Sequence, residues 1–321
     1  MKLKWAATLS LTCVTGLTAG IAQAAFPDRP LTIVVPTAPG GGNDAMARIL
    51  AKRMGQELGQ SIVVENKPGA NGAIACSYVA RSKPDGYTIL FGYIATHAIN
   101  PAIRKVPYNP VTDFDPIGEV ATSPTLLVVN DKVPVKSVAQ LVAYSKKPGV
   151  HLNYASAGTG TAPQMAGELF KLSTGAVMQG VPYKGAGPAM IDTISGVTQV
   201  MFPSLFTGAP QIRSGSVKGL AVLSDKRSPL FSQLPTLKEL GIDVSVEEWY
   251  ALFAPAGTPP AVVTRLNKVL DDALRDPQVA RQFSAQGATV RGGTPRNLAH
   301  LVTTDLAKWK KVAAAAHLAA N

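Results

Sequence analysis

The sequence is 321 residues long, with 46% hydrophobic residues, 16% charged residues and a formal net charge of +11. A chain of this length can bury a large core and is typical of two domains. The excess of basic residues does not indicate a nucleic-acid partner, because Lys and Arg are scattered and only 6% of the residues are aromatic. It favours small anionic ligands, because a positive field raises the rate at which they encounter the protein.

The N-terminus has the pattern of a secretory signal peptide. Lys2 and Lys4 form a short positive region, and Trp5–Ile21 carries no charge. Ala22–Ala24 then supplies the small residues that a signal peptidase reads. A membrane anchor is the alternative, but the apolar run is short for a span. We therefore expect residues 1–24 to be removed, the mature chain to begin at Ala25, and the protein to reside in the periplasm of a Gram-negative bacterium.

The first part of the mature chain alternates short apolar strands with helical patterns. Apolar residues recur at helical spacing between Met46 and Leu58, and Lys83–Gly86 is a proline-glycine turn. This alternation predicts β-α-β units, which form parallel sheets covered by helices. The predicted strands are Leu31–Val35, Ile62–Glu65 and Tyr87–Gly92, and a second helix is predicted over Ala70–Arg81.

A fresh set of such units follows the apolar strand Leu126–Val129, and we expect it to form a second domain. The chain returns to the first domain near Val244–Phe253. The first domain is therefore expected to comprise residues 25–127 and 250–321, and the second residues 128–249. Further predicted strands are Leu152–Ala155, Val177–Val181, Gln199–Phe202 and Gly219–Leu223, and further predicted helices are Val138–Lys146, Gln164–Leu172, Pro188–Ile194 and Asn267–Leu274.

A glycine-rich loop, Pro39–Asp44, joins the first strand to the first helix. Its glycines let backbone N–H groups approach a ligand without a Cβ in the way, and the helix that follows offers unpaired N–H donors and a partial positive charge. The loop therefore predicts an anion site, and the alternative is a tight turn capped by Asn43 or Asp44. The candidate binding residues here are Thr37, Ala38, Gly41, Gly42, Asn43 and Asp44.

The segment Asn153–Thr161 repeats the order of strand, glycine loop and helix. Two helix N-termini, one from each domain, can face a shared cleft, because open α/β sheets bind ligands beyond the carboxyl ends of their strands. Thr96 follows the third strand and can reach the same place. For each hydroxyl group, a local cap is the alternative. The candidate binding residues from this part of the argument are Thr96, Ser156, Gly158, Gly160 and Thr161.

Patterns of catalytic and metal-binding residues are missing from the sequence. The four histidines lack metal-ligand spacing, and neither a G-x-S-x-G elbow nor a paired acid and base is present. We expect His97 to be structural and Cys76 to be a buried, inert thiol. The sequence therefore predicts a binding protein and not an enzyme, with no metal ion and no cofactor.

Six segments, in conserved order along nearly the whole mature chain, resemble the Bug family, the periplasmic substrate-binding proteins of tripartite tricarboxylate transporters. The resemblance implies a two-domain α/β fold of the periplasmic-binding-protein (Venus flytrap, type II-like) class, with a ligand cleft between two lobes. It also implies a small organic carboxylate ligand, held largely by backbone donors of the two glycine loops, and membrane permease subunits as partners. We expect a monomer. The segments are Val34–Asp44, Val64–Ala70, Pro84–Thr88, Thr96–Pro101, Val181–Gly185 and Trp249–Pro259.

Two positions depart from the family pattern in the variable part of the pocket. Gln164 stands where the family usually has histidine, and Pro203 where it commonly has aspartate or asparagine. Tyr183, near the cleft mouth, completes the candidate site. Because Pro203 offers no charge to a ligand ammonium group, this pattern predicts a carboxylate with a neutral or apolar body, in preference to aspartate, glutamate or citrate. The alternative is that another residue or a water molecule compensates for the missing charge. An alternative function is a ligand-loaded periplasmic sensor that docks on a membrane signalling protein.

Overall fold

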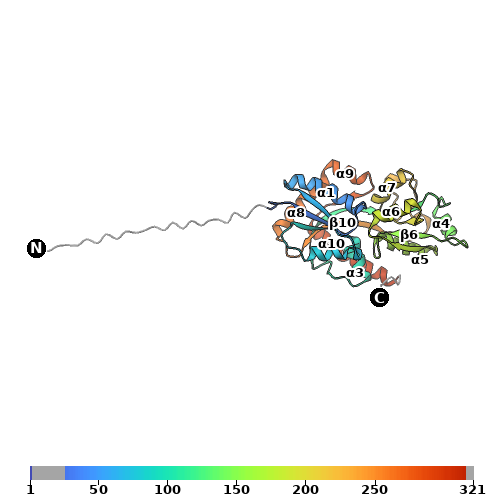
Figure 1. The fold of residues 1–321 in the computed structure, drawn as a ribbon, viewed down its shortest axis with the longest axis horizontal. Helices are drawn as coiled ribbons and strands as arrows, with labels where there is room; N and C mark the ends of the chain where they lie inside the picture. Colours follow the sequence, from blue (N-terminus) through green and yellow to red (C-terminus); the bar gives the residue numbers. More distant parts are fainter. Residues whose placement is uncertain (2–25, 316–321) are drawn as a thin grey trace.

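The structure, a computed structural model, describes Met1 and residues 26–315. Two α/β lobes lie side by side along the long axis of the molecule (Figure 1). We call the six-stranded sheet with its helices the first lobe, and the five-stranded sheet with its helices the second lobe. The predicted signal peptide, apart from Met1, lies outside the described residues.

The first sheet has the strand order β11-β4-β10-β3-β1-β2. β1 is parallel to β2 and to β3, as the β-α-β pattern predicted. β10 is antiparallel to β3 and β4, and β11 is antiparallel to β4. The strands are β1 (Leu31–Val35), β2 (Ile62–Asn66), β3 (Thr88–Tyr93), β4 (Phe114–Pro124), β10 (Glu247–Pro255) and β11 (Thr289–Val290).

The helices of the first lobe bury their apolar faces against this sheet. α1 (Gly42–Leu58) buries Met46, Leu50 and Met54 at helical spacing and ends at Gly59, whose φ of 67° is a conformation that glycine adopts without strain. Short helical turns cover Ala70–Gly72 and Ala95–Ile99. The other helices are α2 (Ala73–Ala80), α3 (Asn100–Ile103), α8 (Pro260–Arg275), α9 (Pro277–Ser284) and α10 (Pro295–Ala315).

The second sheet has the strand order β7-β6-β8-β5-β9, and α4 to α7 surround it (Figure 1). Short helical turns at Pro229–Phe231 and Lys238–Leu240 precede the return to the first lobe. The strands are β5 (Leu126–Asn130), β6 (Asn153–Ser156), β7 (Gln179–Pro182), β8 (Val200–Met201) and β9 (Val217–Val222). The helices are α4 (Val138–Ser145), α5 (Ala162–Thr174), α6 (Ala186–Ser195) and α7 (Leu205–Arg213).

The prediction of parallel sheets was wrong for the strands that connect the lobes. β5 is antiparallel to both β8 and β9, just as β10 is antiparallel to both of its neighbours. The physical reason is that β5 and β10 carry the chain from one lobe to the other and so enter their sheets against the direction of the β-α-β strands. β4 and α7 were not predicted at all.

The two connecting segments lie side by side where the chain crosses between the lobes. The N–H of Thr125 donates to the carbonyl of Val246 at 3.2 Å, and the N–H of Leu223 donates to the carbonyl of Thr125 at 2.7 Å. The N–H of Val246 in turn donates to the carbonyl of Leu223 at 2.9 Å. The outgoing and the returning chain are therefore joined by hydrogen bonds at the crossing.

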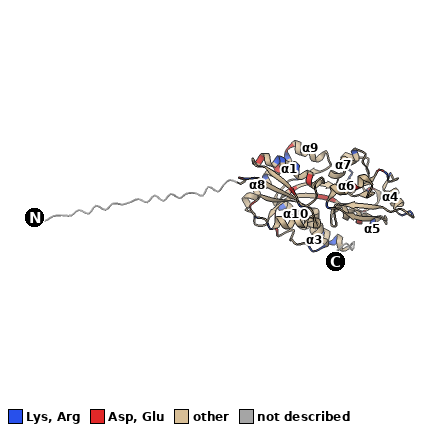
Figure 2. Cartoon of the chain, viewed as in Figure 1, with Lys and Arg blue, Asp and Glu red and all other residues tan. Residues whose placement is uncertain are grey.

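Charged residues are dispersed over both lobes among a majority of uncharged residues (Figure 2). This distribution agrees with the scatter of Lys and Arg along the sequence. Within residues 26–315, no helix is both long and apolar enough to cross a membrane.

Candidate functional site

A small cavity lies between the two lobes, at the N-termini of four helices. It is lined by Gly41, Thr161 and Ser204, which precede α1, α5 and α7, and by Ala186, the first residue of α6. The volume open to the centres of water molecules is about 20 Å³, which is room for one or two waters. The lining residues are Thr37, Gly41, Gly42, Asn43, Tyr93, Ala157, Thr161, Pro163, Ala186, Ser204, Thr207, Glu248 and Tyr250.

The first-lobe side of this cavity offers hydrogen-bond donors that have no partner in the protein. The Oγ1 of Thr37 and the Nδ2 of Asn43 are buried and make no hydrogen bond to any residue that the structure describes. Gly41 precedes α1 without a side-chain cap, so the first N–H groups of this helix are also left for a ligand. The helix N-terminus adds a partial positive charge, and these donors together suit an anion.

Asp44 and Asn66 hold the first glycine loop in place. The N–H of Gly40 donates to Asp44 Oδ2 at 3.1 Å, and Arg48 Nε donates to Asp44 Oδ1 at 3.0 Å. Burial raises the pKa of Asp44, but the hydrogen bonds from Arg48 and Gly40 outweigh this effect and leave the pKa below its ordinary value. The Nδ2 of Asn66 donates to the carbonyl of Thr37 at 3.0 Å. Asp44 therefore supports the loop, and it does not line the cavity.

The second glycine loop makes internal hydrogen bonds, although α5, like α1, begins without a side-chain cap. The Oγ1 of Thr161 donates to the carbonyl of Gly158 at 2.6 Å, and the N–H of Gly160 donates to Gln164 Oε1 at 2.5 Å. Pro163, in the first turn of α5, has no N–H to offer. Gln164 therefore braces its own loop in this structure, and neither Gln164, Gly158 nor Gly160 lines the cavity.

The first sheet contributes a buried acid to the cavity. Glu248, at the start of β10, accepts a hydrogen bond from the hydroxyl group of Tyr250 at 2.6 Å. Burial raises the pKa of Glu248 to about 7, and the hydrogen bond from Tyr250 acts in the opposite direction. The nearby charge of Glu248 also helps to raise the pKa of Tyr93, for which burial is the larger cause. Glu248 is the one charged side chain among the described residues that line the cavity.

The two lobes touch closely around the cavity. The N–H of Ala38 donates to the carbonyl of Lys184 in the second lobe at 3.0 Å. A Cβ added to Gly41 would lie 3.2 Å from the backbone nitrogen of Gly187, and a Cβ on Gly160 would overlap Asn100 Oδ1 of the first lobe. Both glycine loops therefore form part of the contact between the lobes.

The structure thus divides the candidate site residues into three groups. Five line the cavity: Thr37, Gly41, Gly42, Asn43 and Thr161. Ala38 lies in a separate groove along the interlobe contact, together with Gly41 and Gly42. The remaining candidates do not line the cavity: Asp44, Thr96, Ser156, Gly158, Gly160, Gln164, Tyr183 and Pro203.

Several members of the third group have identifiable structural partners. The Oγ1 of Thr96 donates to the carbonyl of Tyr93 at 2.9 Å. The carbonyl of Ser156 accepts from the N–H of Tyr183 at 3.0 Å, and the hydroxyl group of Tyr183 donates to Asp192 at 2.7 Å. The carbonyl of Pro203 accepts from the N–H of Leu126 at 2.8 Å. These residues shape the surroundings of the cavity without contributing to its wall.

The sequence interpretation missed eight of the lining residues, and Glu248 is the most consequential of them. Its sequence signal is the pair Glu247–Glu248 directly before the apolar strand Trp249–Phe253. A pair of acids at this place is usually solvent-exposed, and only the three-dimensional fold buries the second one. The others are Tyr93, Ala157, Pro163, Ala186, Ser204, Thr207 and Tyr250.

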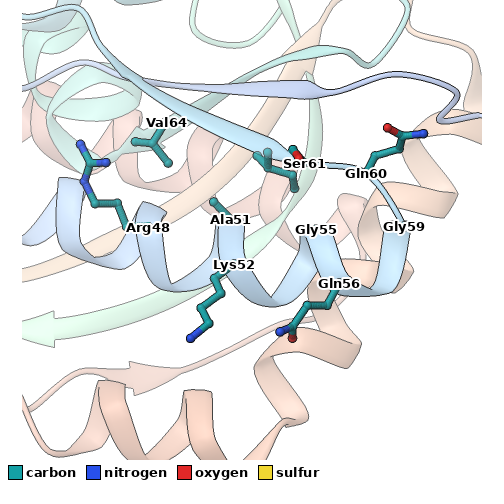
Figure 3. Close-up of a pocket in the computed structure, with 10 residues that line it drawn as sticks. Arg48, Ala51, Lys52, Gly55, Gln56, Gly59, Gln60, Ser61 and Val64 are labelled. Carbon is teal, nitrogen blue, oxygen red and sulfur yellow. The ribbon is translucent and has the colours of Figure 1, made fainter.

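A larger hollow lies along the flank of α1, beside the edge strand β2 (Figure 3). Polar and charged side chains line it, among them Arg48, Lys52 and Gln56. It shares no lining residue with the interlobe cavity. None of its lining residues has a buried hydrogen-bond donor without a partner. We therefore place the candidate site in the smaller cavity.

His97 and Cys76 belong to the core of the first lobe. The ring of His97 stacks on Phe253 with centroids 3.9 Å apart, and burial lowers its pKa to about 3. Cys76 is buried, and burial raises its pKa to about 12, so its thiol is inert at neutral pH. Within the described residues, no group of three or more His, Cys, Asp or Glu side chains is arranged to hold a metal ion.

Comparison with known proteins identifies close relatives. The family model of the tripartite tricarboxylate transporter family receptor matches residues 46–318. Protein BugT of Bordetella pertussis is 36% identical over 300 residues, which cover 92% of each chain. An R. palustris protein solved with adipate is 37% identical with a TM-score of 0.88, covering 91% of this chain and 98% of that one. The periplasmic binding protein BugD is 36% identical with a TM-score of 0.88, covering 92% and 99%. These similarities confirm the predicted α/β binding-protein fold and a binding role rather than catalysis.

Proposed function

Because this chain belongs to the tripartite tricarboxylate transporter receptor family, we propose that it captures a small organic carboxylate between its lobes and presents it to membrane permease subunits. One observation carries this proposal. Thr37 and Asn43 line the interlobe cavity, and each has a buried side-chain donor without a partner. They lie beside the N-terminus of α1, which no side chain caps. The adipate bound by the R. palustris relative supports the same ligand class.

A carboxylate matches these donors because an ionised carboxylate is purely a hydrogen-bond acceptor. The hydroxyl group of Thr37, the amide of Asn43 and the first N–H groups of α1 can each donate to it. Hydrogen bonds to charged groups contribute about 1.5–3 kcal/mol each. Four to six of them contribute about 6–18 kcal/mol in total. This range includes the roughly 8 kcal/mol of micromolar binding, and any surplus offsets the lost freedom of the ligand.

We infer that the lobes separate to admit the ligand, because the cavity has room for only one or two water molecules. The crossing at Thr125, Leu223 and Val246 provides two adjacent connections about which the lobes can rotate. We propose that each sheet moves with its own helices as one domain. Residues 247–249 at the start of β10 then move with the first lobe, and not with residues 128–249 as the sequence division expected. The ligand then favours the closed form because it contacts both lobes.

The remaining part of the proposal concerns export. The signal-peptide pattern of residues 1–24 and the similarity to the periplasmic binding protein BugD support a mature protein in the periplasm that begins at Ala25. N-terminal sequencing of the exported protein tests the cleavage site. An uncleaved, membrane-bound product would contradict it.

The ligand proposal is tested by native mass spectrometry of protein purified from its source, followed by calorimetric titration. The panel comprises adipate, glutarate, L-glutamate, citrate and benzoate. We expect at least one carboxylate to bind at micromolar concentration, and Thr37→Val, which keeps the shape of the side chain but removes the hydroxyl group, to weaken it about tenfold or more. Absence of any bound or co-purified carboxylate would contradict the proposal.

A further inference from the structure

The cavity contains a buried acid that the protein does not neutralise. Glu248 lies at the start of β10 and is buried in the cavity wall. Its Oε2 accepts one hydrogen bond, from Tyr250, and none of the lining residues described by the structure is Lys, Arg or His. A buried carboxylate without a cationic partner is costly, so the site is complete only when something else supplies the positive charge or a proton.

Two opposing effects act on the charge of Glu248. Burial disfavours its ionised form, whereas the helix N-termini around the cavity favour negative charge. Four helices begin there, α1, α5 and α7 after Gly41, Thr161 and Ser204 and α6 at Ala186. The hydroxyl group of Tyr250 also donates to the carboxylate and so stabilises its ionised form. Besides Glu248 and Tyr250, the titratable group in the described wall is Tyr93, which pairs with Tyr250 across the sheet. Its raised pKa keeps it uncharged at neutral pH.

A ligand carboxylate at α1 places two anions in one small cavity. Like charges in such a space repel strongly unless a cation lies between them. The described side chains of the wall provide no cation, so Glu248 either takes up a proton or meets a cation that the ligand brings. We propose that Glu248 selects ligands that carry an ammonium group beside the carboxylate, so that the substrate class of this site is small amino acids.

This inference rests on the proposed function, since it takes the carboxylate at α1 as given. It replaces the expectation of a neutral or apolar ligand body, which was based on Pro203. That expectation assumed that an ammonium group would find no acid in the pocket. Glu248 is such an acid, and it comes from the strand that enters the first sheet and not from the position of Pro203.

The test compares matched pairs of ligands that differ only in the amino group. The probes are L-glutamate with glutarate, L-norvaline with pentanoate, and γ-aminobutyrate with butanoate, titrated calorimetrically at pH 8. In the wild type, at least one amino acid should bind about tenfold or more tightly than its partner without the amino group. Glu248→Gln should lose most of this preference. Glu247→Gln removes the same charge from the exposed neighbouring residue and should keep it.

A second measurement needs no variant and therefore does not depend on the folding of Glu248→Gln. In the wild type, amino-acid affinity should rise as the pH increases through 7, because Glu248 then becomes ionised. Tighter binding of the deaminated acid in every pair, or an unchanged preference in Glu248→Gln, would overturn the inference. The inference would also be overturned if the affinity for a dicarboxylate fell as the pH rises, because protonated Glu248 would then donate a hydrogen bond to the ligand. In these cases the proposed function still stands; if no carboxylate binds at all, the proposed function itself fails.

Discussion

The two glycine loops of this protein have similar backbone conformations but differ in the hydrogen-bonding groups that they leave without a partner. Gly40 and Gly160 have similar φ values of 85° and 75°, and each donates its N–H to the side chain four residues later, Asp44 or Gln164. The residues that face the cavity differ: Thr37 and Asn43 in the first loop correspond to Ala157 and Pro163 in the second. The first loop therefore presents unpartnered side-chain donors. The second loop presents Ala157, Pro163 and a Thr161 hydroxyl group that already donates to Gly158, although α5 also begins without a side-chain cap. We expect the first loop to make the stronger contacts with the ligand and the second to close over it.

The largest effect is expected when the first loop is given the residues of the second. Thr37→Ala combined with Asn43→Pro removes two unpartnered side-chain donors and the backbone N–H of residue 43, and proline is already accommodated at the matching position of α5. The loss of two hydrogen bonds to a charged ligand, about 1.5–3 kcal/mol each, should weaken carboxylate binding more than about 100-fold in calorimetric titration. The reverse exchange, Pro163→Asn, should retain binding. Equal losses from both exchanges would contradict the assignment of binding to the first loop.

A second experiment tests whether Glu248, in the first lobe, has the raised pKa of a buried acid. The pKa of Glu248 is raised to about 7 in the folded protein, so the folded state binds more protons than the unfolded state above pH 4.5. Stability should therefore fall by about 3 kcal/mol as the pH rises from 4.5 to 8 and the group ionises at its folded pKa. Glu248→Gln should remove this slope in chemical denaturation without ligand, and Glu247→Gln should not. An unchanged slope in Glu248→Gln would assign the pH dependence to other groups.

A third experiment tests the closing role of the second loop. A Cβ on Gly160 would overlap Asn100 Oδ1, whereas a Cβ on Gly40, at a similar positive φ, would meet nothing within 4 Å. Gly160→Ala should therefore hinder closure at a cost of about 1–3 kcal/mol, which small-angle scattering would detect as a larger radius of gyration with ligand. Gly40→Ala is the matched control for backbone strain. Asn100→Ala in the Gly160→Ala background should restore closure, and failure to do so would place the obstruction elsewhere.

The smallest effect is expected for the side chain that braces the second loop. Gln164→Ala removes the hydrogen bond to the N–H of Gly160, which should lower the free energy of unfolding by about 1 kcal/mol. Ligand affinity should stay within about threefold, because Gln164 does not line the cavity. A loss of tenfold or more in affinity, with stability intact, would restore Gln164 as a direct ligand contact.

Much of the fold could be predicted because its elements follow local patterns. The strand Leu31–Val35 and the helix after it were recognised from apolar runs and helical spacing. β4 was missed because it contains Pro116 and Gly118, which interrupt the alternation typical of a strand, and α7 was missed because it contains Gly208 and Pro210. In both cases the packing of the lobes outweighs the local propensity.

The cavity-lining residues that the sequence indicated all lie in or beside the two glycine loops. Glycines, a hydroxyl and an amide before a helix signalled the first loop. The second loop contains similar glycines, but its internal hydrogen bonds and Pro163 are evident only from geometry. Glu248 and Ser204 reach the cavity from elements far away in the sequence, and no local pattern distinguishes a buried acid from an exposed one.

The position of β10 has a consequence for the rates of binding. This strand lies between β3 and β4 and begins one residue after the crossing at Val246, so Glu248 stays with the first lobe when the lobes part. An incoming ligand can therefore meet Thr37, Asn43 and Glu248 in the open protein, and these residues should govern the association rate. Ser204 and Thr207 arrive with the second lobe, so their contacts form only on closure and should govern the dissociation rate. We therefore expect the first lobe to capture the ligand and the second lobe to retain it. A transport partner that pulled the second lobe away would release the ligand while its contacts with the first lobe were still in place.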